Sequence, residues 1–461
     1  MLSKSNYLIG LQCLRLLWTY KNDKESMPEH SEETLFRFDQ GKEVGELAKK
    51  LFPKGIDIED KDFKYNLKKT QEFLDKNVPL FEPSFLVEDL YARADILVPT
   101  GKKWDIIEVK SSSSVKDVNT HDLAFQRYVY EKAGLKIRKC FLMHLNKDYR
   151  LKGKVSVRNL FKIDDITDEV KNNSILIPEN VERMQDILEG KMPKVDIGKQ
   201  CKKPYACNLI NECWAFLPED SVMELYNSRK KFELLDSGVL LMKDIPKTFE
   251  LNDKQEIQVK GKVHVDKKKI SNWLGGLKEP IYYMDFETFM TAIPMYQGCK
   301  PYQQICFQYS LHVKGKHYEY LSKGLRDPRK MFLNSLLKRL GDKGSIVVYN
   351  KSFEINRLKE LGSYYDVDVS SVVDRIVDLM DVFRGFYYYD PKQKGGCGLK
   401  AVLPCFGLDY SDLEIQGGSV ASLEFFRGFN DENVRESLLE YCKRDTYAEV
   451  VIVEKLREMV E

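Results

Sequence analysis

Two carboxylates, Asp285 and Glu287, stand one residue apart in the run IYYMDFETFM at residues 281–290, which is otherwise apolar and aromatic. If this run is a strand, alternation places both acids on one face with Tyr283 and Phe289. Buried carboxylates are strongly destabilising unless they are paired or bind a metal. The chemistry indicated is therefore the binding of a hard divalent cation through carboxylate oxygens.

Two later segments supply further groups of the same kind. Glu354 opens a helix directly after the strand that ends in VVYN, and Tyr441 and Asp445 lie four residues apart in YCKRDTYAEVVIV. Residues at this spacing share one face of a helix. Asn350 lies at the end of the same strand.

This order of residues resembles the DEDD exonucleases, which have Asp-x-Glu on a first strand and a further acid on a later helix. The Tyr-x-x-x-Asp motif on the last helix resembles their DEDDy subgroup, which has an RNase H-like fold. The resemblance runs from residue 281 to residue 445, and the segment LKAVLPCFGLDYSDLEIQGG is similar to one that precedes the last helix in predicted bacterial exonucleases. The family normally has Asp where this chain has Glu354.

The resemblance implies a two-metal site for 3′–5′ hydrolysis. Two Mg²⁺ or Mn²⁺ ions would be held by four carboxylates, those of Asp285, Glu287, Glu354 and Asp445. One ion activates a water, and the other stabilises the leaving 3′-oxygen. Tyr441 is expected to orient the water.

A second set of charged residues lies near the N-terminus. Asp95 is in ADILV, and Glu108 and Lys110 are in WDIIEVK, two strand-like runs joined by a turn at PTGKK. Glu108 and Lys110 are two residues apart, so their side chains leave the same face of a strand. The acids could hold one divalent metal while the lysine polarises the attacking water or the scissile phosphate. The alternative is an edge strand with charge on its solvent face.

Gln126 and Tyr130 follow on one face of an expected helix. Asp, Glu-x-Lys and Gln-x-x-x-Tyr together resemble the PD-(D/E)xK nucleases, and within them the RecB-like branch. The resemblance implies a restriction-endonuclease-like domain, with one or two Mg²⁺ or Mn²⁺ ions at Asp95 and Glu108 and with Gln126 and Tyr130 beside the DNA backbone.

That branch usually has a Gly-x-x-x-His motif on an early helix, with the histidine as a further metal ligand. In this chain GKEVG spans residues 41–45, so Gly45 stands at the position of the histidine. The fourth ligand is then either missing or supplied by Glu43 or Glu46.

Four of the ten cysteines form a separate group: Cys201, Cys207 and Cys213, six residues apart, and the distant Cys13. The spacing does not fit the C-x₂₋₄-C pairs of zinc ribbons, whereas four cysteines are the usual ligands of an iron–sulfur cluster. Buried free thiols and zinc are the alternatives. The pattern resembles the iron–sulfur nucleases of the CRISPR-associated RecB-like and AddB types. The resemblance implies a 4Fe–4S cluster that clamps the two ends of the domain together.

The elements that must position these residues are of α/β type. Helix-period spacing at residues 1–52, strand patterns at 81–111 and a helix ending near Gly134 indicate one βαβ unit, and a second begins at 281. We expect three parts: residues 1–216 as a RecB-like nuclease domain with an iron–sulfur cluster, 217–278 as a helical connector, and 279–461 as an RNase H-like DEDDy domain.

Composition narrows the class of protein. The 461 residues include 73 basic and 71 acidic side chains, a net charge of +2, so a nucleic acid would have to bind through local basic patches. At 43% hydrophobic residues, wholesale disorder is excluded. Neither a membrane-length apolar run nor a signal peptide is recognisable, which favours the cytoplasm.

The sequence therefore predicts a metal-dependent nuclease that acts on DNA with single-stranded character and has no membrane partner. The loop FRGFYYYDPKQKGG at 383–396 could stack bases or could be a plain loop with packed tyrosines. Two alternatives stay open: an N-terminal domain that only guides a strand to the exonuclease, and an RNA substrate. End preference, pathway, oligomeric state and any helicase, CRISPR or repair partner also stay open.

Overall fold

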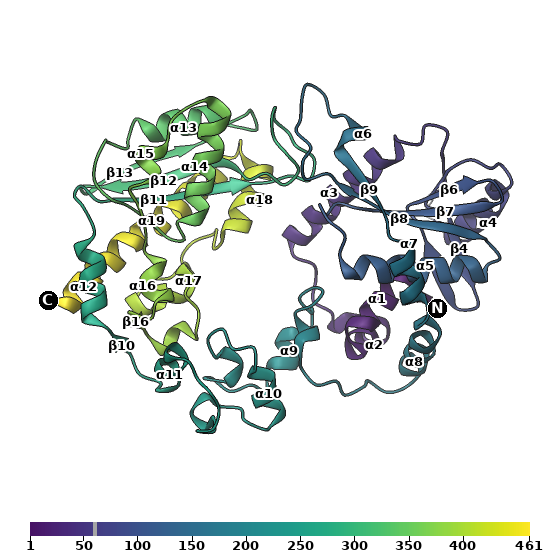
Figure 1. The fold of residues 1–461 in the computed structure, drawn as a ribbon, viewed down its shortest axis with the longest axis horizontal. Coiled ribbons are helices and arrows are strands. Elements are labelled where there is room, and N and C mark those ends of the chain that lie inside the picture. The colour runs from purple at the N-terminus through teal and green to yellow at the C-terminus, as the bar shows by residue number, and fades with distance from the viewer. Residues whose placement is uncertain (59–61) are drawn as a thin grey trace. The chain divides into compact units, whose positions relative to one another are not determined.

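The chain folds as two compact units of mixed α/β structure in the computed structural model, which describes residues 1–58 and 62–461 (Figure 1). Unit 1 contains Met1–Phe216 and Thr291–Gln303, and unit 2 contains Leu217–Met290 and Gln304–Glu461. The α/β class expected from the sequence is confirmed. None of the described helices is long and apolar enough to cross a lipid bilayer.

Unit 1 is built on a six-stranded mixed sheet. Its strands, in spatial order, are β2 (Ile56–Asp57), β3 (Leu80–Phe81), β6 (Ile96–Thr100), β7 (Lys103–Lys110), β8 (Ile137–Leu145) and β9 (Phe161–Asp165). β6 and β7 form the expected antiparallel hairpin, and β7 and β8 are parallel. Parallel neighbours need a crossover, which helix α5 (Asp117–Lys132) provides. α5 is followed by Gly134, whose φ of +93° suits glycine.

Smaller elements complete unit 1. A three-stranded sheet has the order β1 (Leu2–Ser3), β5 (Leu90–Arg93) and β4 (Ser84–Val87). The other helices are α1 (Lys4–Gln12), α2 (Leu14–Asn22), α3 (Glu32–Lys49), α4 (Phe63–Leu74), α6 (Val157–Leu160), α7 (Thr167–Ser174), α8 (Ile177–Glu189) and α9 (Ile210–Trp214).

The two faces of the unit 1 sheet bury different cores. Ile106 of β7 packs into a core that includes Phe125 of α5, whereas its neighbour Ile107 packs into one that includes Val44 of α3. Alternation along β7 therefore turns Glu108 toward the α5 face, as it does Ile106.

Residues 291–303 cluster with unit 1, although the sequence placed them in the domain 279–461. Ala292 is buried in the core beside α3, and its backbone N–H donates to Oε1 of Gln40 over 2.5 Å. The backbones of Leu151 and Cys299 are joined by an N–H···O bond of 2.9 Å. Apolar burial and backbone pairing hold this segment in unit 1, and neither leaves a recognisable pattern in the sequence.

Unit 2 is built on a five-stranded sheet with β11 at its centre. The strands, in spatial order, are β13 (Lys316–Leu321), β12 (Ile305–Val313), β11 (Tyr282–Phe289), β14 (Ile346–Val348) and β15 (Ile376–Asp378). β12 runs antiparallel to β11, and β14 runs parallel to it.

Helices cover both faces of this sheet (Figure 1). Met284 and Phe286 of β11 share a core with Phe332 of α13 (Arg329–Leu337) and Leu358 of α14 (Ser352–Tyr365). On the alternate face, Phe289 stacks on Phe425 of α18 (Gly418–Gly428), with ring centroids 5.7 Å apart. The long helix α19 (Glu432–Val460) begins after the N-cap Asp431 and supplies the rest of that cover. Asp285 and Glu287 face this second side.

The stretch 217–278, expected to be a connector, clusters with unit 2 and has a small core of its own that includes Val222, Leu234 and Met242. Its regular elements are α10 (Lys231–Asp236), α11 (Asp253–Val259), α12 (Lys267–Gly275) and β10 (His264–Val265). β10 pairs with β16 (Tyr388–Tyr389), and short helices α15 (Ser370–Val373), α16 (Met380–Arg384) and α17 (Leu399–Val402) complete the unit.

Candidate functional site

Unit 2 brings together the four carboxylates that the sequence singled out. Asp285 and Glu287 come from β11, Glu354 from the first turn of α14, and Asp445 from the middle of α19. Electrostatic coupling links each of them to at least one of the others. The four therefore form one acidic cluster between the central strand and two helices.

Three carboxylates of the cluster are buried, and Asp285 is half-buried. Glu287, Glu354 and Asp445 are 7%, 1% and 7% exposed. Burial raises the pKa of Glu354 well above its usual range, and the negative charge of Asp285 adds to the effect. Burial, then Asp285 and Asp445, does the same to the pKa of Glu287. Among the described residues, none of these carboxylates forms an ion pair within 4 Å.

Unpaired oxygens point to a cation in this place. Oε2 of Glu354 is buried and has no hydrogen-bond partner among the described residues. Potential ligand atoms of Asp285, Glu287 and Cys442 lie within 4.8 Å of one another. Carboxylates that are desolvated without partners are the ligands that Mg²⁺ and Mn²⁺ need, so the residues present fit such an ion.

Local irregularity in the sheet accompanies the acidic pair. The register between β11 and β12 shifts between Glu287 and Thr288, which leaves Phe307 as the extra residue of a bulge. Such bulges re-aim neighbouring side chains and are frequent beside active sites. Cys442, expected to be an ordinary core residue, lies with its Sγ 3.7 Å from Oδ2 of Asp285.

Two tyrosines lie beside Asp445. The hydroxyl of Tyr410 donates to Oδ1 of Asp445, and the ring of Tyr441 packs against that of Tyr410 with centroids 5.8 Å apart. Burial raises the pKa of Asp445 to about 6, while Tyr410, Tyr441 and the charge of Lys400 oppose the rise. The expected role of Tyr441 in orienting a water stays a prediction.

Sequence reasoning missed three members of this neighbourhood: Glu449, Tyr410 and Lys400. Glu449 lies one turn beyond Asp445 on α19, so the spacing of four that joins Tyr441 to Asp445 could have found it. Lys400, on α17, is exposed and acts electrostatically on Glu287 and Asp445. Both Lys400 and Tyr410 lie in the segment LKAVLPCFGLDYSDLEIQGG, so its similarity to predicted exonucleases was the signal that could have found them.

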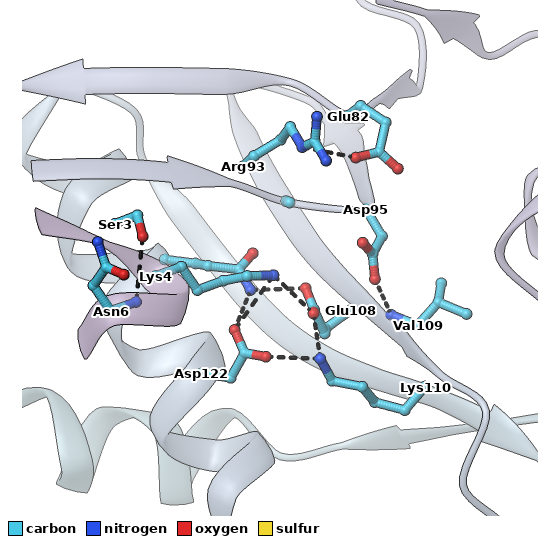
Figure 2. A network of polar contacts seen from close by, with 12 residues as sticks. Ser3, Lys4, Asn6, Glu82, Arg93, Asp95, Glu108, Val109, Lys110 and Asp122 are labelled. Atoms are coloured by element: carbon cyan, nitrogen blue, oxygen red, sulfur yellow. Dashed lines mark hydrogen bonds and ion pairs between the residues drawn. The ribbon is translucent and has the colours of Figure 1, made fainter. Parts of the chain in front are cut away.

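In unit 1 the acids expected from the sequence lie beside lysine side chains, unlike the acids of unit 2 (Figure 2). Oε1 of Glu108 accepts from Nζ of Lys110 at 2.7 Å and from Nζ of Lys4 at 2.9 Å. Asp122 of α5, which the sequence did not suggest, lies 2.8 Å from Lys110 and 3.5 Å from Lys4. Asp95 lies beside the network, and its Oδ2 accepts from the backbone N–H of Val109 at 2.6 Å.

Two ammonium groups therefore face two buried carboxylates. Burial opposes the charged form of Asp122, yet Lys110 and Lys4 outweigh it and lower the pKa of that carboxyl. Burial likewise opposes the charged form of Lys110, and the charges of Asp122 and Glu108 still raise its pKa. Lys4 is fixed as the first residue of α1, directly after the N-cap Ser3, whose Oγ accepts from the N–H of Asn6 (Figure 2). Lys4 and Lys110 thus pair with both carboxylates, although burial and the charges of Asp122 and Asp95 still raise the pKa of Glu108.

Gln126 and Tyr130 are both fully buried. Nε2 of Gln126 donates to Oε2 of Glu108 at 2.7 Å. The hydroxyl of Tyr130 donates to the carbonyl of Pro83 at 2.6 Å and accepts from the N–H of Ala94 at 2.9 Å. A contact with a DNA backbone would need exposed side chains. Gln126 and Tyr130 are instead buried and contact other groups of the protein.

The candidates for a further ligand lie on α3. Glu43 and Glu46 are exposed, and Glu46 forms an ion pair of 2.7 Å with Lys49. A Cβ on Gly45 would meet nothing within 4 Å, so the position has open space. Neither glutamate is among the described contacts of Glu108.

The four cysteines of the expected cluster line one cavity. Cys13 lies between α1 and α2, while Cys201, Cys207 and Cys213 lie in the segment that ends unit 1. All four are free thiols, and burial together with the neighbouring thiols raises the pKa of Cys207. Four converging thiols fit an iron–sulfur cluster or another thiolate-bound metal.

Hydrogen bonds join the two segments that carry these cysteines. Nε2 of Gln12 donates to the carbonyls of Gln200 at 2.9 Å and Tyr205 at 2.8 Å. Arg15 forms an ion pair with Glu212. The N-terminal helices and the end of unit 1 are thus held together at the cavity.

The aromatic loop at 383–396 is mostly packed. Phe383, Phe386, Tyr388 and Tyr389 are buried, and Phe386 stacks on Tyr389 with ring centroids 4.8 Å apart. Of the two interpretations of this loop, base stacking and packed aromatic side chains, the second describes these four residues.

Comparisons with known proteins give similarity without an activity. Residues 282–397, which include Asp285, Glu287 and Glu354, match the family described as a domain of unknown function, DUF2779. A solved structure described as the crystal structure of SSO0001 is similar over 46% of this chain and 98% of its own, at 16% identity and a TM-score of 0.18. A TM-score this low carries no argument about the fold.

Three curated relatives come from mollicutes. The Uncharacterized protein MG366 homolog of Mycoplasma pneumoniae is 28% identical over 289 residues, 50% of this chain and 42% of that protein. The Uncharacterized protein MG366 of Mycoplasma genitalium is 28% identical over 42% of this chain and 34% of its own length. The Uncharacterized protein UU173 of Ureaplasma parvum is 27% identical over 40% and 32%. The matched part of this chain spans less than half the length of each relative.

Proposed function

We propose that the chain is a metal-dependent nuclease whose cutting site is the acidic cluster of unit 2, in a DEDDy-type 3′–5′ exonuclease domain of RNase H-like fold. The observation that carries the proposal is the burial of Glu287, Glu354 and Asp445 around the half-buried Asp285, with no ion pair within 4 Å to any of the four among the described residues. A fold tolerates such a set when a metal binds it. The order of these residues along the chain supports phosphodiester hydrolysis among the reactions that metals assist.

The roles of the side chains follow from their contacts. Asp285, Glu287, Glu354 and Asp445 would hold Mg²⁺ or Mn²⁺, which when bound activates a water and stabilises the leaving oxygen. Tyr410 fixes the carboxylate of Asp445 by a hydrogen bond, and Tyr441 would orient the attacking water. The exposed ammonium of Lys400, near the rim of the cluster, is placed to attract a phosphate.

DNA with a free single-stranded end is the proposed substrate, because an exonuclease site of this kind takes one strand at a time. RNA is the alternative substrate, since no described contact is aimed at a 2′-hydroxyl.

The first prediction concerns activity. Asp285→Asn removes one charge at nearly constant shape, and we expect the Mn²⁺-dependent digestion of 5′-end-labelled single-stranded DNA to fall about 100-fold or more, because several kcal/mol of transition-state stabilisation are lost. Asp342→Asn, the same change at an exposed position of unit 2, should leave the rate unchanged. Equal rates for Asp285→Asn and the wild type, or a wild type that digests neither DNA nor RNA, would contradict the proposal.

A second prediction concerns pH. The pKa of Asp445 is about 6 in the fold, against about 3.9 in an unfolded chain, so the metal-free fold is stabilised by the bound proton below about pH 4 and loses this contribution as pH rises through 6. Metal binding must displace that proton. The increase in melting temperature caused by Mn²⁺ should therefore be small at about pH 5 and larger at about pH 8.

Differential scanning fluorimetry across this pH range measures the effect. Glu287→Gln should abolish most of the Mn²⁺-induced shift at every pH. A shift that is the same at the two ends of the range would show that the buried carboxylates are not the ligands.

We further propose that Cys13, Cys201, Cys207 and Cys213 hold a 4Fe–4S cluster that joins the ends of unit 1 without redox work. Protein purified without oxygen should be brown with absorbance near 400 nm, and should contain iron and sulfide. Cys207→Ser should lose the colour and lower the melting temperature, whereas Cys405→Ser, outside the cavity, should keep both. Stoichiometric zinc without iron in the wild type would overturn this assignment.

The second candidate function concerns unit 1. We propose that it is a PD-(D/E)xK-type module of the RecB-like branch, which binds nucleic acid without cutting it. The observation that favours it is the pairing of Glu108 with both Lys4 and Lys110, which supplies inside the protein the positive charge that a metal would bring. A cutting site here would need Lys4 to give way to the ion.

Closed circular single-stranded DNA tests whether unit 1 cuts or only binds nucleic acid, because a circle has no end for the exonuclease site of unit 2. We expect the wild type to leave the circle intact in Mn²⁺ while digesting the same strand once it is linear. Cleavage of the circle that Glu108→Gln removes and Asp285→Asn retains would establish unit 1 as a second cutting site.

A further inference from the structure

Cys442 is a buried thiol of α19 that lies against the acidic pair of β11. It is 0% exposed, and its Sγ lies 3.7 Å from Oδ2 and 3.9 Å from the backbone carbonyl oxygen of Asp285. Ligand atoms of Asp285, Glu287 and Cys442 all lie within 4.8 Å of one another. The thiol and the two acids therefore form one compact group of potential metal ligands.

Hydrogen bonds on either side of Cys442 fix its place beside the sheet. One turn before it, the carbonyl of Leu438 accepts from Nε2 of Gln308 at 2.7 Å. One turn after it, the hydroxyls of Thr446 and Ser310 are 2.6 Å apart. Gln308 and Ser310 are the residues of β12 that pair with the two acids of β11. The bonds therefore hold α19, and with it the thiol, in register with the acidic pair.

Glu287 is the member of this group that lacks a partner. Its side chain is 7% exposed, and no described residue gives its carboxylate a hydrogen bond or an ion pair. A buried carboxylate without a partner is strongly unfavourable unless a cation binds it. Its oxygen is within reach of the other two ligand atoms, so one ion can bind all three.

The distance between the thiol and Asp285 is that of neighbouring ligands of zinc. Zn–S bonds of about 2.3 Å and Zn–O bonds of about 2.1 Å place the sulfur and oxygen ligands of a tetrahedral ion about 3.6 Å apart. Sγ of Cys442 and Oδ2 of Asp285 are 3.7 Å apart. Mg²⁺ and Mn²⁺ prefer oxygen ligands, whereas a thiolate favours softer ions such as Zn²⁺. The sulfur therefore changes which ion this group of ligands prefers.

Cys306 is a buried thiol of unit 2 in a different environment. It lies on β12, is 1% exposed and belongs to the apolar core that includes Phe332. This is the environment of a small core residue. Cys306 is therefore a matched control for Cys442.

We propose that Cys442, Asp285 and Glu287 form a binding site for Zn²⁺, and that Zn²⁺ bound there inhibits the hydrolysis supported by Mg²⁺ or Mn²⁺ in unit 2. The proton of the thiol leaves to solvent when the sulfur–zinc bond forms. Zinc then occupies the two carboxylates of β11 that the catalytic ions need. The inhibition rests on the proposed function, whereas the binding of zinc does not.

Binding is measured by titration of the full chain with Cd²⁺, which takes the ligands of zinc and whose bond to a thiolate absorbs in the ultraviolet. The wild type should form one more cadmium–thiolate bond than Cys442→Ser, while Cys306→Ser should titrate as the wild type does. The four thiols of the cavity in unit 1 are present in every variant and contribute equally. Glu287→Gln keeps the thiol and should weaken this cadmium site by about 10-fold or more, at least as much as loss of an outer partner of a metal ligand does.

Two results of this titration would overturn the zinc site. If Cys442 is only a small buried residue, Cys442→Ser and Cys306→Ser will give identical titrations. If Cys442→Ser does not fold, Glu287→Gln decides, because a cadmium–thiolate signal identical to that of the wild type would show that thiol and carboxylate do not share an ion.

Inhibition is measured with 5′-end-labelled single-stranded DNA at a fixed excess of Mn²⁺. Zn²⁺ should inhibit the wild type and Cys306→Ser at the same concentration, and Cys442→Ser should need about 10-fold more. Equal sensitivity of Cys442→Ser and the wild type would overturn the inhibitory role. A chain that binds Cd²⁺ through Cys442 but digests neither DNA nor RNA would retain the zinc site, while the nuclease proposal, and the inhibition with it, would fall.

Discussion

The repulsion between carboxylates buried on one face of β11 is the constraint on which the interpretation of unit 2 depends. Glu287 is buried and Asp285 is half-buried, because α18 and α19 cover their side of the sheet. Glu354 and Asp445 add two more carboxylates. Tyr410 donates a hydrogen bond to Asp445, but this bond does not remove the net negative charge of the cluster. A metal-free fold must therefore hold protons, and a metal-bound fold can release them.

Unit 1 also buries carboxylates, but there lysine side chains pair with them. Glu108 and Asp122 are as deeply buried as the acids of unit 2, yet Lys4 and Lys110 lie within hydrogen-bonding or ion-pairing distance of them. Gln126 completes the network by donating to both acids. The acids of unit 1 are held by ion pairs and hydrogen bonds within the protein, whereas the four carboxylates of unit 2 form no ion pair within 4 Å among the described residues. This difference is the reason why we propose unit 2 as the cutting site.

Much of the framework was predictable from local sequence. The alternation in IYYMDFETFM predicted which residues of β11 share a face, and the period of four predicted that Tyr441 and Asp445 meet on α19. The hairpin that carries Asp95 and Glu108 and the helix that ends before Gly134 were equally readable. These features depend on side chains close together in the chain.

What could not be predicted depends on contacts between distant segments. Lys4 and Glu108 are 104 residues apart, and no sequence pattern at either position predicts that they pair. Residues 291–303 cluster with unit 1 through backbone pairing, which any sequence can supply. Tyr130 matched a motif by type, but whether a tyrosine faces solvent or the carbonyl of Pro83 is decided by packing.

Diffraction from crystals of the full chain soaked in Mn²⁺, recorded for its anomalous signal, tests the central claim most directly, because it locates the ions without reference to any activity. The account predicts two anomalous peaks in unit 2, both within coordination distance of carboxylate oxygens from β11, α14 and α19, and none beside Glu108. Peaks at Glu108 with none at Asp285 would contradict it.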